Sequence, residues 1–263
     1  MSIGVSTACL YPMETEKALA VLGACGVEVT EIFLNSWSEL SDDFCRQLRN
    51  LREQYGMRVR SIHPFTSGIE SYMLFSAYLR RFTDCREIYK KYFAAAAELG
   101  ADFVVLHGDR LGNGLPIEEY CQRFLLLQED AATFGVRLLQ ENVNKYRASQ
   151  PAFIREMRRL SGDTIGFVFD IKQSIRAGFG PQAVLDAMGE RIAHVHISDH
   201  DGDWDCLLPG KGTCDFRRLF SDLAVRGYAG DYMIEVYRSA FSEPAQLANA
   251  SQWLNREFSA VIK

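Results

Sequence analysis

The stretches GFVFDIKQ (residues 166–173) and AHVHISDH (residues 193–200) decide the fold of this chain. Each is a short run of largely β-branched or aromatic residues that ends in polar side chains. Continuous apolar runs of this length are typical of strands buried on both faces, as in a parallel sheet. They predict two buried parallel strands whose last residues, Asp170 and His196, are candidates for function.

The same pattern recurs along the whole chain. We expect eight strands, at Ile3–Thr7, Val27–Phe33, Arg58–His63, Phe103–His107, Arg137–Glu141, Gly166–Asp170, Ala193–Ile197 and Tyr232–Val236. Helical stretches fall between them, with five marked by apolar spacing or a following glycine, at Glu14–Cys25, Ala77–Leu99, Ile117–Thr133, Phe216–Val225 and Ala245–Phe258. Strands that alternate with helices predict a parallel sheet with right-handed crossovers.

The number of units favours a closed barrel. Eight strand–helix units in 263 residues average about 33 residues each, the usual unit size of a (β/α)8 barrel. We therefore predict an α/β protein in which residues 1–263 form a single TIM-barrel domain. An open doubly wound sheet is the alternative, but it needs a GxGxxG loop after an early strand, which Gly4, Gly23 and Gly26 do not form.

Composition and charge limit the partners. The chain is 48% apolar and 24% charged, as expected of a globular protein. Its 29 basic and 34 acidic residues give a net charge of −5, which argues against nucleic acid and anionic membranes as partners. No apolar stretch approaches the ~20 residues of a membrane helix. The seven cysteines form no CxxC motif, so we expect reduced thiols and a cytoplasmic protein.

Polar side chains stand at the ends of six predicted strands. They are His63, His107, Glu141, Asp170, His196 and Glu235. Because the carboxyl ends of barrel strands form one rim, these residues should converge there. Carboxylates combined with imidazoles suit a divalent ion such as Mn²⁺, Mg²⁺, Co²⁺ or Zn²⁺, and such an ion would relieve the repulsion between the carboxylates. We expect His194 to point away from His196.

Five motifs in order carry a family resemblance. They are ENV (141–143), FDIK (169–172), HVHISD (194–199), LPGKG (208–212) and IEVY (234–237). Over essentially its whole length, the chain resembles the xylose-isomerase-like TIM-barrel superfamily. The resemblance implies one divalent metal ion held by Glu141, Asp170, His196 and Glu235. It also implies that Glu141 and Glu235 move protons on opposite faces of the substrate, and it allows a homo-oligomer.

The first functional hypothesis is a metal-dependent isomerase or epimerase of a small sugar, polyol or sugar phosphate, with glutamate-mediated proton transfer through an enediolate. We expect the substrate to contact six residues: His63, His107, Lys172, Gln173, Lys211 and Glu31. Gln173 replaces a histidine that is common in the family. An inosose-type dehydratase and a non-catalytic sugar-binding barrel are the alternatives. An apurinic endonuclease is disfavoured by Gln173 and by the acidic net charge.

Overall fold

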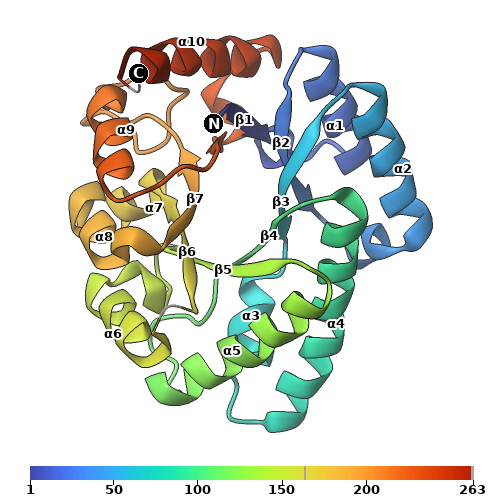
Figure 1. The fold of residues 1–263 in the computed structure, drawn as a ribbon, viewed down its shortest axis with the longest axis vertical. Helices are drawn as coiled ribbons and strands as arrows, with labels where there is room; N and C mark the ends of the chain where they lie inside the picture. The colour runs from blue at the N-terminus through green and yellow to red at the C-terminus, as the bar shows by residue number, and fades with distance from the viewer. Residues whose placement is uncertain (163, 262–263) are drawn as a thin grey trace.

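Eight parallel strands close into a barrel in chain order, β1 to β8, in the computed structural model of the protein (Figure 1). The structure describes residues 1–162 and 164–261. The strands are β1 (Ile3–Ser6), β2 (Val29–Leu34), β3 (Arg58–Pro64), β4 (Phe103–Leu106), β5 (Arg137–Glu141), β6 (Gly166–Asp170), β7 (Ile192–Ile197) and β8 (Tyr232–Ile234). The predicted (β/α)8 barrel is confirmed, and each predicted strand overlaps an observed one.

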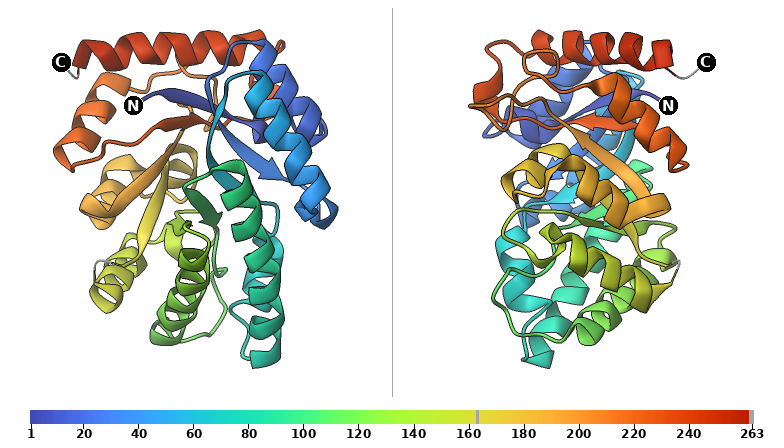
Figure 2. Two further views of the ribbon diagram at one scale, coloured as in Figure 1. Left: turned by 45° about the vertical axis from the view of Figure 1, so that its right-hand side comes forward. Right: turned by 90° about the vertical axis from the view of Figure 1, so that its left-hand side faces the viewer.

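Helices surround the barrel and cover the outer face of its strands (Figures 1 and 2). They are α1 (Thr15–Ala24), α2 (Asp42–Gln54), α3 (Ser67–Met73), α4 (Leu79–Leu99), α5 (Ile117–Thr133), α6 (Pro151–Ser161), α7 (Ile171–Arg176), α8 (Gly180–Met188), α9 (Phe216–Val225) and α10 (Ala245–Val261). The five helices expected from the sequence are all present. Their observed ends differ from the predicted ones by at most three residues.

The barrel closes where the first strand meets the last. Ile3 lies opposite Tyr232, so β1 pairs with β8 on one side and with β2 on the other. Helix α10 fastens this seam: Ser251 Oγ donates to the Ile3 carbonyl at 2.6 Å, and Asn255 Oδ1 accepts from the Ile3 amide at 3.3 Å. The two ends of the chain therefore stabilise each other.

Alternation along the strands determines which side chains enter the barrel. Phe103, Val105, Leu139 and Val168 form a small apolar cluster of their own, whereas Val104 and Leu106 belong to the larger core that includes the helix side chains. Since residues two apart share a face of a strand, the positions that follow the small cluster also point inward. These positions are His107, Glu141 and Asp170. On β4, β5 and β6, an apolar layer thus lies beneath the polar residues of the rim.

The alternation of side chains along a strand also corrects the prediction made for His194. His194 and His196 are two residues apart on β7, and they lie opposite Val168 and Asp170 of β6. Both histidines therefore face the barrel interior, and the prediction that His194 points away from His196 was wrong. Their ring centroids are 5.1 Å apart.

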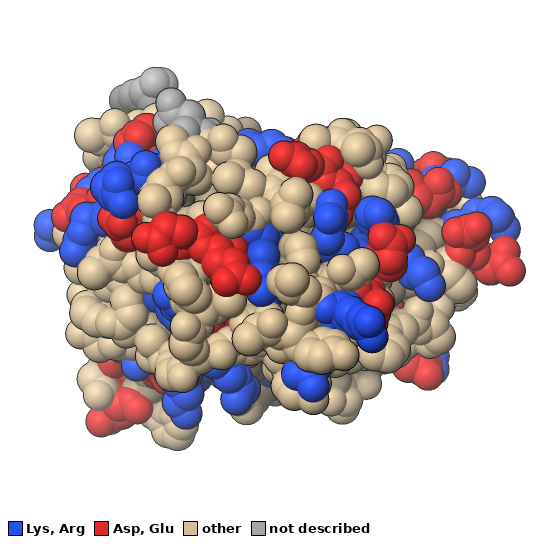
Figure 3. Space-filling model, turned by 90° about the horizontal axis from the view of Figure 1, so that it is seen from below, with Lys and Arg blue, Asp and Glu red and all other residues tan. Residues whose placement is uncertain are grey.

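Three further features concern the thiols, the helices and the surface charge. All seven cysteines are free thiols. Within residues 1–162 and 164–261, no helix has the length and apolar character needed to cross a membrane. On the face shown in Figure 3, acidic and basic side chains are interspersed rather than gathered into one basic surface.

Candidate active site

Four side chains meet at the carboxyl ends of β5 to β8. Glu141, Asp170, His196 and Glu235 each offer a ligand atom, and these atoms all lie within 4.8 Å of one another. The cluster is centred on His196 Nδ1, which is 3.3 Å from Glu141 Oε1, 3.2 Å from Glu235 Oε2 and 3.8 Å from Asp170 Oδ2. These are the four metal ligands expected from the sequence, brought together by four successive strands.

The chemistry of this cluster fits a divalent cation. Asp170 Oδ2 is buried and lacks a hydrogen-bond partner among the residues that the structure describes. Burial raises the pKa of Asp170, and the neighbouring Glu235 and Glu141 carboxylates act in the same direction. Two buried carboxylates and the partly buried Glu235 carboxylate around one imidazole nitrogen repel one another, and oxygen and nitrogen donors in this number suit Mn²⁺, Mg²⁺, Co²⁺ or Zn²⁺.

Lys172 supplies the cation on one side of the cluster. Its ammonium group is buried, 3.2 Å from Glu235 Oε2 and 3.5 Å from Asp170 Oδ2. Burial opposes ionisation of Glu235, but the charges of Lys172 and His196 outweigh it and hold the pKa of Glu235 below its ordinary value. Lys172 therefore keeps Glu235 in the form that can accept a proton.

Two histidines flank Glu141 on the other side. His107 Nε2 is 3.0 Å and His63 Nε2 is 3.6 Å from Glu141 Oε2, and the two Nε2 atoms are 3.1 Å apart. Burial alone would lower the pKa of His63, but the nearby carboxylates of Glu141 and Glu31 raise it to about 9. Both histidines, predicted as substrate contacts, thus lie against a proposed catalytic carboxylate.

Glu31 lies beneath the rim rather than on it. Its side chain is fully buried, and its Oε2 atom is 3.1 Å from His196 Nε2 and 3.4 Å from His194 Nε2. Ser61 Oγ donates to the same oxygen at 2.7 Å and lies 3.1 Å from His194 Nε2. His196 is therefore held from below by Glu31 while its Nδ1 atom faces the carboxylate cluster.

Gln173 makes hydrogen bonds to other residues of the protein. Its backbone N–H donates to Asp170 Oδ1 at 2.9 Å, and its side-chain Oε1 accepts from the backbone N–H of Asn144 at 3.0 Å. The side chain thereby connects the loop after β5 to the start of α7.

Lys211 lies in a loop built around Asp199. The Asp199 carboxylate accepts hydrogen bonds from four backbone amides of residues 200–214, including those of Gly210 and Gly212 at 2.9 Å each. A Cβ atom on Gly212 would lie 2.3 Å from the His200 carbonyl oxygen, so glycine permits this close approach. The Lys211 side chain is exposed on the loop.

A cavity of about 410 Å³ opens beside the cluster. Lys172 and Glu235 form its polar end. The other lining residues are Ala8, Tyr11, Phe33, Asn35, Phe65, Val236 and Tyr237. The aromatic walls come from the ends of β1, β2, β3 and β8, so a sequence analysis that treats one strand at a time misses them.

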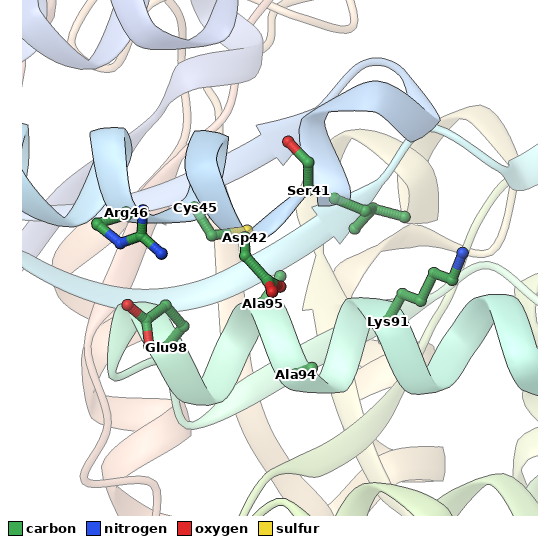
Figure 4. Close-up of a pocket in the computed structure, with 9 residues that line it drawn as sticks. Ser41, Asp42, Cys45, Arg46, Lys91, Ala94, Ala95 and Glu98 are labelled. Atoms are coloured by element: carbon green, nitrogen blue, oxygen red, sulfur yellow. The ribbon is translucent and has the colours of Figure 1, made fainter.

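A larger cavity lies away from the cluster, between α2 and α4 (Figure 4). It measures about 700 Å³, and Arg46 and Glu98 at its edge are paired with Asp43 and Arg49 respectively. Its lining combines these paired charges with Ala94 and Ala95. Of these two cavities, the smaller one lies beside the carboxylates and the imidazole of the four-residue cluster, so it is the candidate active-site cavity.

Comparison with known proteins identifies the family. Residues 17–257 match the xylose isomerase-like TIM barrel family, and the chain belongs to it. A fructoselysine 3-epimerase from Escherichia coli O157:H7 is 23% identical over 209 residues, covering 76% of this chain and 75% of the relative.

Solved structures have the same fold. A D-tagatose 3-epimerase-like protein superposes with a TM-score of 0.78 at 21% identity, covering 99% of this chain and 98% of the other. The IOLI protein, solved with a bound zinc atom, gives a TM-score of 0.78 at 16% identity over the full length of both chains.

Proposed function

We propose that this protein is a divalent-metal-dependent isomerase or epimerase of a small sugar, polyol or sugar phosphate. The observation that carries the proposal is the convergence of Glu141, Asp170, His196 and Glu235 within 4.8 Å at the catalytic end of the barrel. The relatives support it, since one is a sugar 3-epimerase and a structural neighbour holds zinc.

The four residues would hold one cation, Mn²⁺, Mg²⁺, Co²⁺ or Zn²⁺. When bound, the cation supplies Lewis-acid polarisation of a substrate carbonyl. The proton transfer would fall to the two glutamates. Glu141 and Glu235 come from different strands, and their carboxylates lie 3.3 and 3.2 Å, respectively, from His196 Nδ1.

Glu235 and Glu141 would share the proton transfer. One carboxylate would remove a proton from the carbon next to the carbonyl, and the other, in its protonated form, would deliver a proton to a neighbouring carbon or to the opposite face. Lys172 keeps Glu235 ionised, while His107 and His63 contact Glu141 Oε2 and can orient that carboxylate or exchange its proton. Gln173 and Lys211 complete the set of proposed substrate contacts, whereas the buried Glu31 would act through His196 rather than on the substrate.

We also propose that residues 1–263 work as one domain in the cytoplasm. The seven free thiols support that compartment, because cysteines in oxidising compartments are commonly paired. A small sugar or sugar phosphate is the proposed binding partner.

The test has two parts, metal content and proton exchange. Protein equilibrated with a mixture of divalent ions and then desalted should retain about one equivalent of metal by mass spectrometry, and His196→Ala should retain none. In D₂O, the loaded protein should incorporate deuterium next to the carbonyl of at least one member of a ketose and ketose-phosphate panel. Glu141→Gln and Glu235→Gln should each abolish that exchange.

The outcomes separate the alternatives. Unchanged exchange in both glutamine variants would exclude these carboxylates as the proton carriers. A product lighter by one water would assign a dehydratase instead, and tight sugar binding without exchange across the panel would assign a binding protein.

A further inference from the structure

A separate cavity of about 380 Å³ lies at the carboxyl end of the barrel, between α3, the start of α4 and the loop after β4. Two arginines line it, Arg81 from the first turn of α4 and Arg110 from the loop. The remaining lining residues belong to the described chain, and all of them are uncharged. The wall of this cavity is therefore positively charged.

Arg81 is held in place without a carboxylate. Its guanidinium group lies 4.0 Å from the ring centroid of Tyr72 and 5.7 Å from that of Tyr78. Its Nη1 atom donates to Ser76 Oγ at 3.4 Å. The side chain is half-buried, yet it forms no ion pair within residues 1–162 and 164–261. A guanidinium group that stacks on an aromatic ring keeps the N–H groups at its edge available to an oxyanion.

Arg110 is also supported by an aromatic ring. Its guanidinium group is 5.6 Å from the ring centroid of Tyr146, and its Nε atom donates to the Tyr146 hydroxyl group at 3.5 Å. Its backbone N–H donates to Ser71 Oγ at 2.9 Å, which connects the loop after β4 to α3. Like Arg81, it has no ion pair in the part of the chain that the structure describes. Both arginines thus keep most of their N–H donors for a ligand.

The carboxylate next to Arg110 in the sequence does not neutralise the cavity. Asp109 is buried, and its Oδ1 atom accepts hydrogen bonds from Ser71 Oγ at 2.6 Å and Asn113 Nδ2 at 2.7 Å. Its Oδ2 atom is 3.5 Å from Nη1 of Arg147, which supplies the opposite charge. Asp109 therefore orients two uncharged side chains of the cavity wall, and the charges of Arg81 and Arg110 remain unpaired.

The loop after β7, where barrel enzymes frequently bind phosphate, has its amides occupied. The Asp199 carboxylate accepts their hydrogen bonds, from the backbone N–H groups of His200, Gly210, Gly212 and Cys214. Asp199 thus fills the position that an oxyanion would need in this loop. The two arginines after β3 and β4 offer an anion what these amides do not.

Tyr146 links the arginine-lined cavity to the candidate active site. Its ring centroid is 5.9 Å from that of His107, and His107 Nε2 is 3.0 Å from Glu141 Oε2. Arg110 and His107 therefore contact the same aromatic ring. An anion bound by Arg110 would lie one aromatic ring away from a histidine of the site.

We propose that the cavity lined by Arg81 and Arg110 binds a phosphate group. Two guanidinium groups match the charge of a phosphate dianion, and each can donate paired hydrogen bonds to its oxygens. The phosphate arrives either on a sugar phosphate whose carbonyl end lies at the metal cluster or as a free phosphate ion. The first source rests on the proposed function, whereas the second is independent of it.

The first test is isothermal titration of the full chain with inorganic phosphate. Metal is first removed on a chelating resin, so that phosphate cannot bind through a cation. Binding should be saturable, and Arg81→Gln and Arg110→Gln should each weaken it roughly ten- to a hundredfold, as expected for lost hydrogen bonds to a charged group. Arg110 is exposed, so its replacement leaves the fold intact even if that of the half-buried Arg81 does not.

The matched control is Arg80→Gln. It removes the same charge from an exposed neighbour of Arg81 that does not line the cavity, so phosphate binding should stay close to that of the wild type. An equal loss of affinity in Arg80→Gln would show a general effect of charge and overturn the inference. Phosphate binding that is absent from the wild type, or that survives both cavity variants, also overturns it.

A second titration identifies the source of the phosphate. Fructose 6-phosphate is titrated into the metal-loaded protein, into Arg110→Gln and into His196→Ala. If the phosphate arrives on the sugar, both variants should bind this compound more weakly than the wild type. Loss of affinity in Arg110→Gln alone assigns the cavity to a phosphate that binds without the metal cluster.

Deuterium exchange on the same samples separates this inference from the proposed reaction. Phosphate binding that depends on the two arginines, without exchange in any compound of the panel, upholds the phosphate site and refutes the isomerase or epimerase assignment. Exchange together with phosphate binding that ignores both arginines does the reverse.

Discussion

Replacing Glu31 should weaken metal binding although Glu31 is not one of the proposed ligands. Its Oε2 atom is 3.1 Å from His196 Nε2, so it accepts the N–H of that nitrogen and leaves Nδ1 free to face the three carboxylates. A histidine ligand whose other nitrogen is held by a carboxylate keeps one ring orientation and one tautomer. Without that acceptor, the imidazole can place its proton on Nδ1, which blocks a cation.

The size of the effect follows from the geometry. A hydrogen bond to a charged acceptor contributes about 1.5–3 kcal/mol, and 1.4 kcal/mol corresponds to a factor of ten in affinity. Glu31 Oε2 also accepts a hydrogen bond from Ser61 Oγ and contacts His194 Nε2, so its interaction with His196 is weaker than that of an acceptor with a single partner. We therefore expect about tenfold weaker metal binding for Glu31→Gln, which keeps a weak acceptor, and about a hundredfold for Glu31→Ala.

The assay is a titration of metal-free protein with Co²⁺, read from visible absorption. The control is Ser61→Ala, which removes another partner of the same oxygen and leaves the Glu31–His196 contact in place. Urea unfolding of each metal-free variant shows separately how far the core is weakened. Wild-type Co²⁺ affinity and an unchanged spectrum in Glu31→Gln would refute the positioning role.

Three other outcomes are expected. Lys172→Met should destabilise the metal-free protein by about 3–5 kcal/mol, because the buried Asp170 and the partly buried Glu235 lose their cation, and added Mn²⁺ should restore much of the melting temperature; an equal loss with and without metal would contradict this. Gly212→Ala should lower stability by about 1–3 kcal/mol, since its Cβ would meet the His200 carbonyl, whereas Gly202→Ala, with open space around it, should melt as the wild type does. Removal from water raises the pKa of the buried Cys9 and of the partly buried Cys214 to about 12, so both should stay protonated at pH 8 and react with a thiol reagent on unfolding; rapid labelling of either in the native protein, identified by mass spectrometry, would argue against these raised pKa values.

The strands and the rim residues could be predicted from the sequence because burial on both faces leaves a continuous apolar run. The ends of those runs then gave Glu141, Asp170 and His196 directly. Helices were harder. Helix α2 is largely polar, and α8 begins with Gly180 and Pro181, which in a sequence are typical of a turn.

What the sequence could not supply was depth within the barrel and neighbours from different loops. The pairing of β2 with β3 shifts between Thr30 and Glu31, so the layer that Glu31 occupies depends on that irregularity. Tyr11 and Tyr237 are more than two hundred residues apart in the chain, and their shared cavity exists only because the barrel closes.

Closure of the barrel at β1 and β8 also has a consequence during synthesis. The edge of β1 that pairs with Tyr232–Ile234 has no partner until that segment leaves the ribosome. The hydrogen bonds of Ser251 and Asn255 with Ile3 form later still. For most of translation, the nascent chain therefore carries an open strand edge, the kind of surface on which neighbouring chains aggregate. Production of this protein is consequently most vulnerable until residues 232–255 have emerged, a stage at which chaperone supply matters more than the stability of the finished fold.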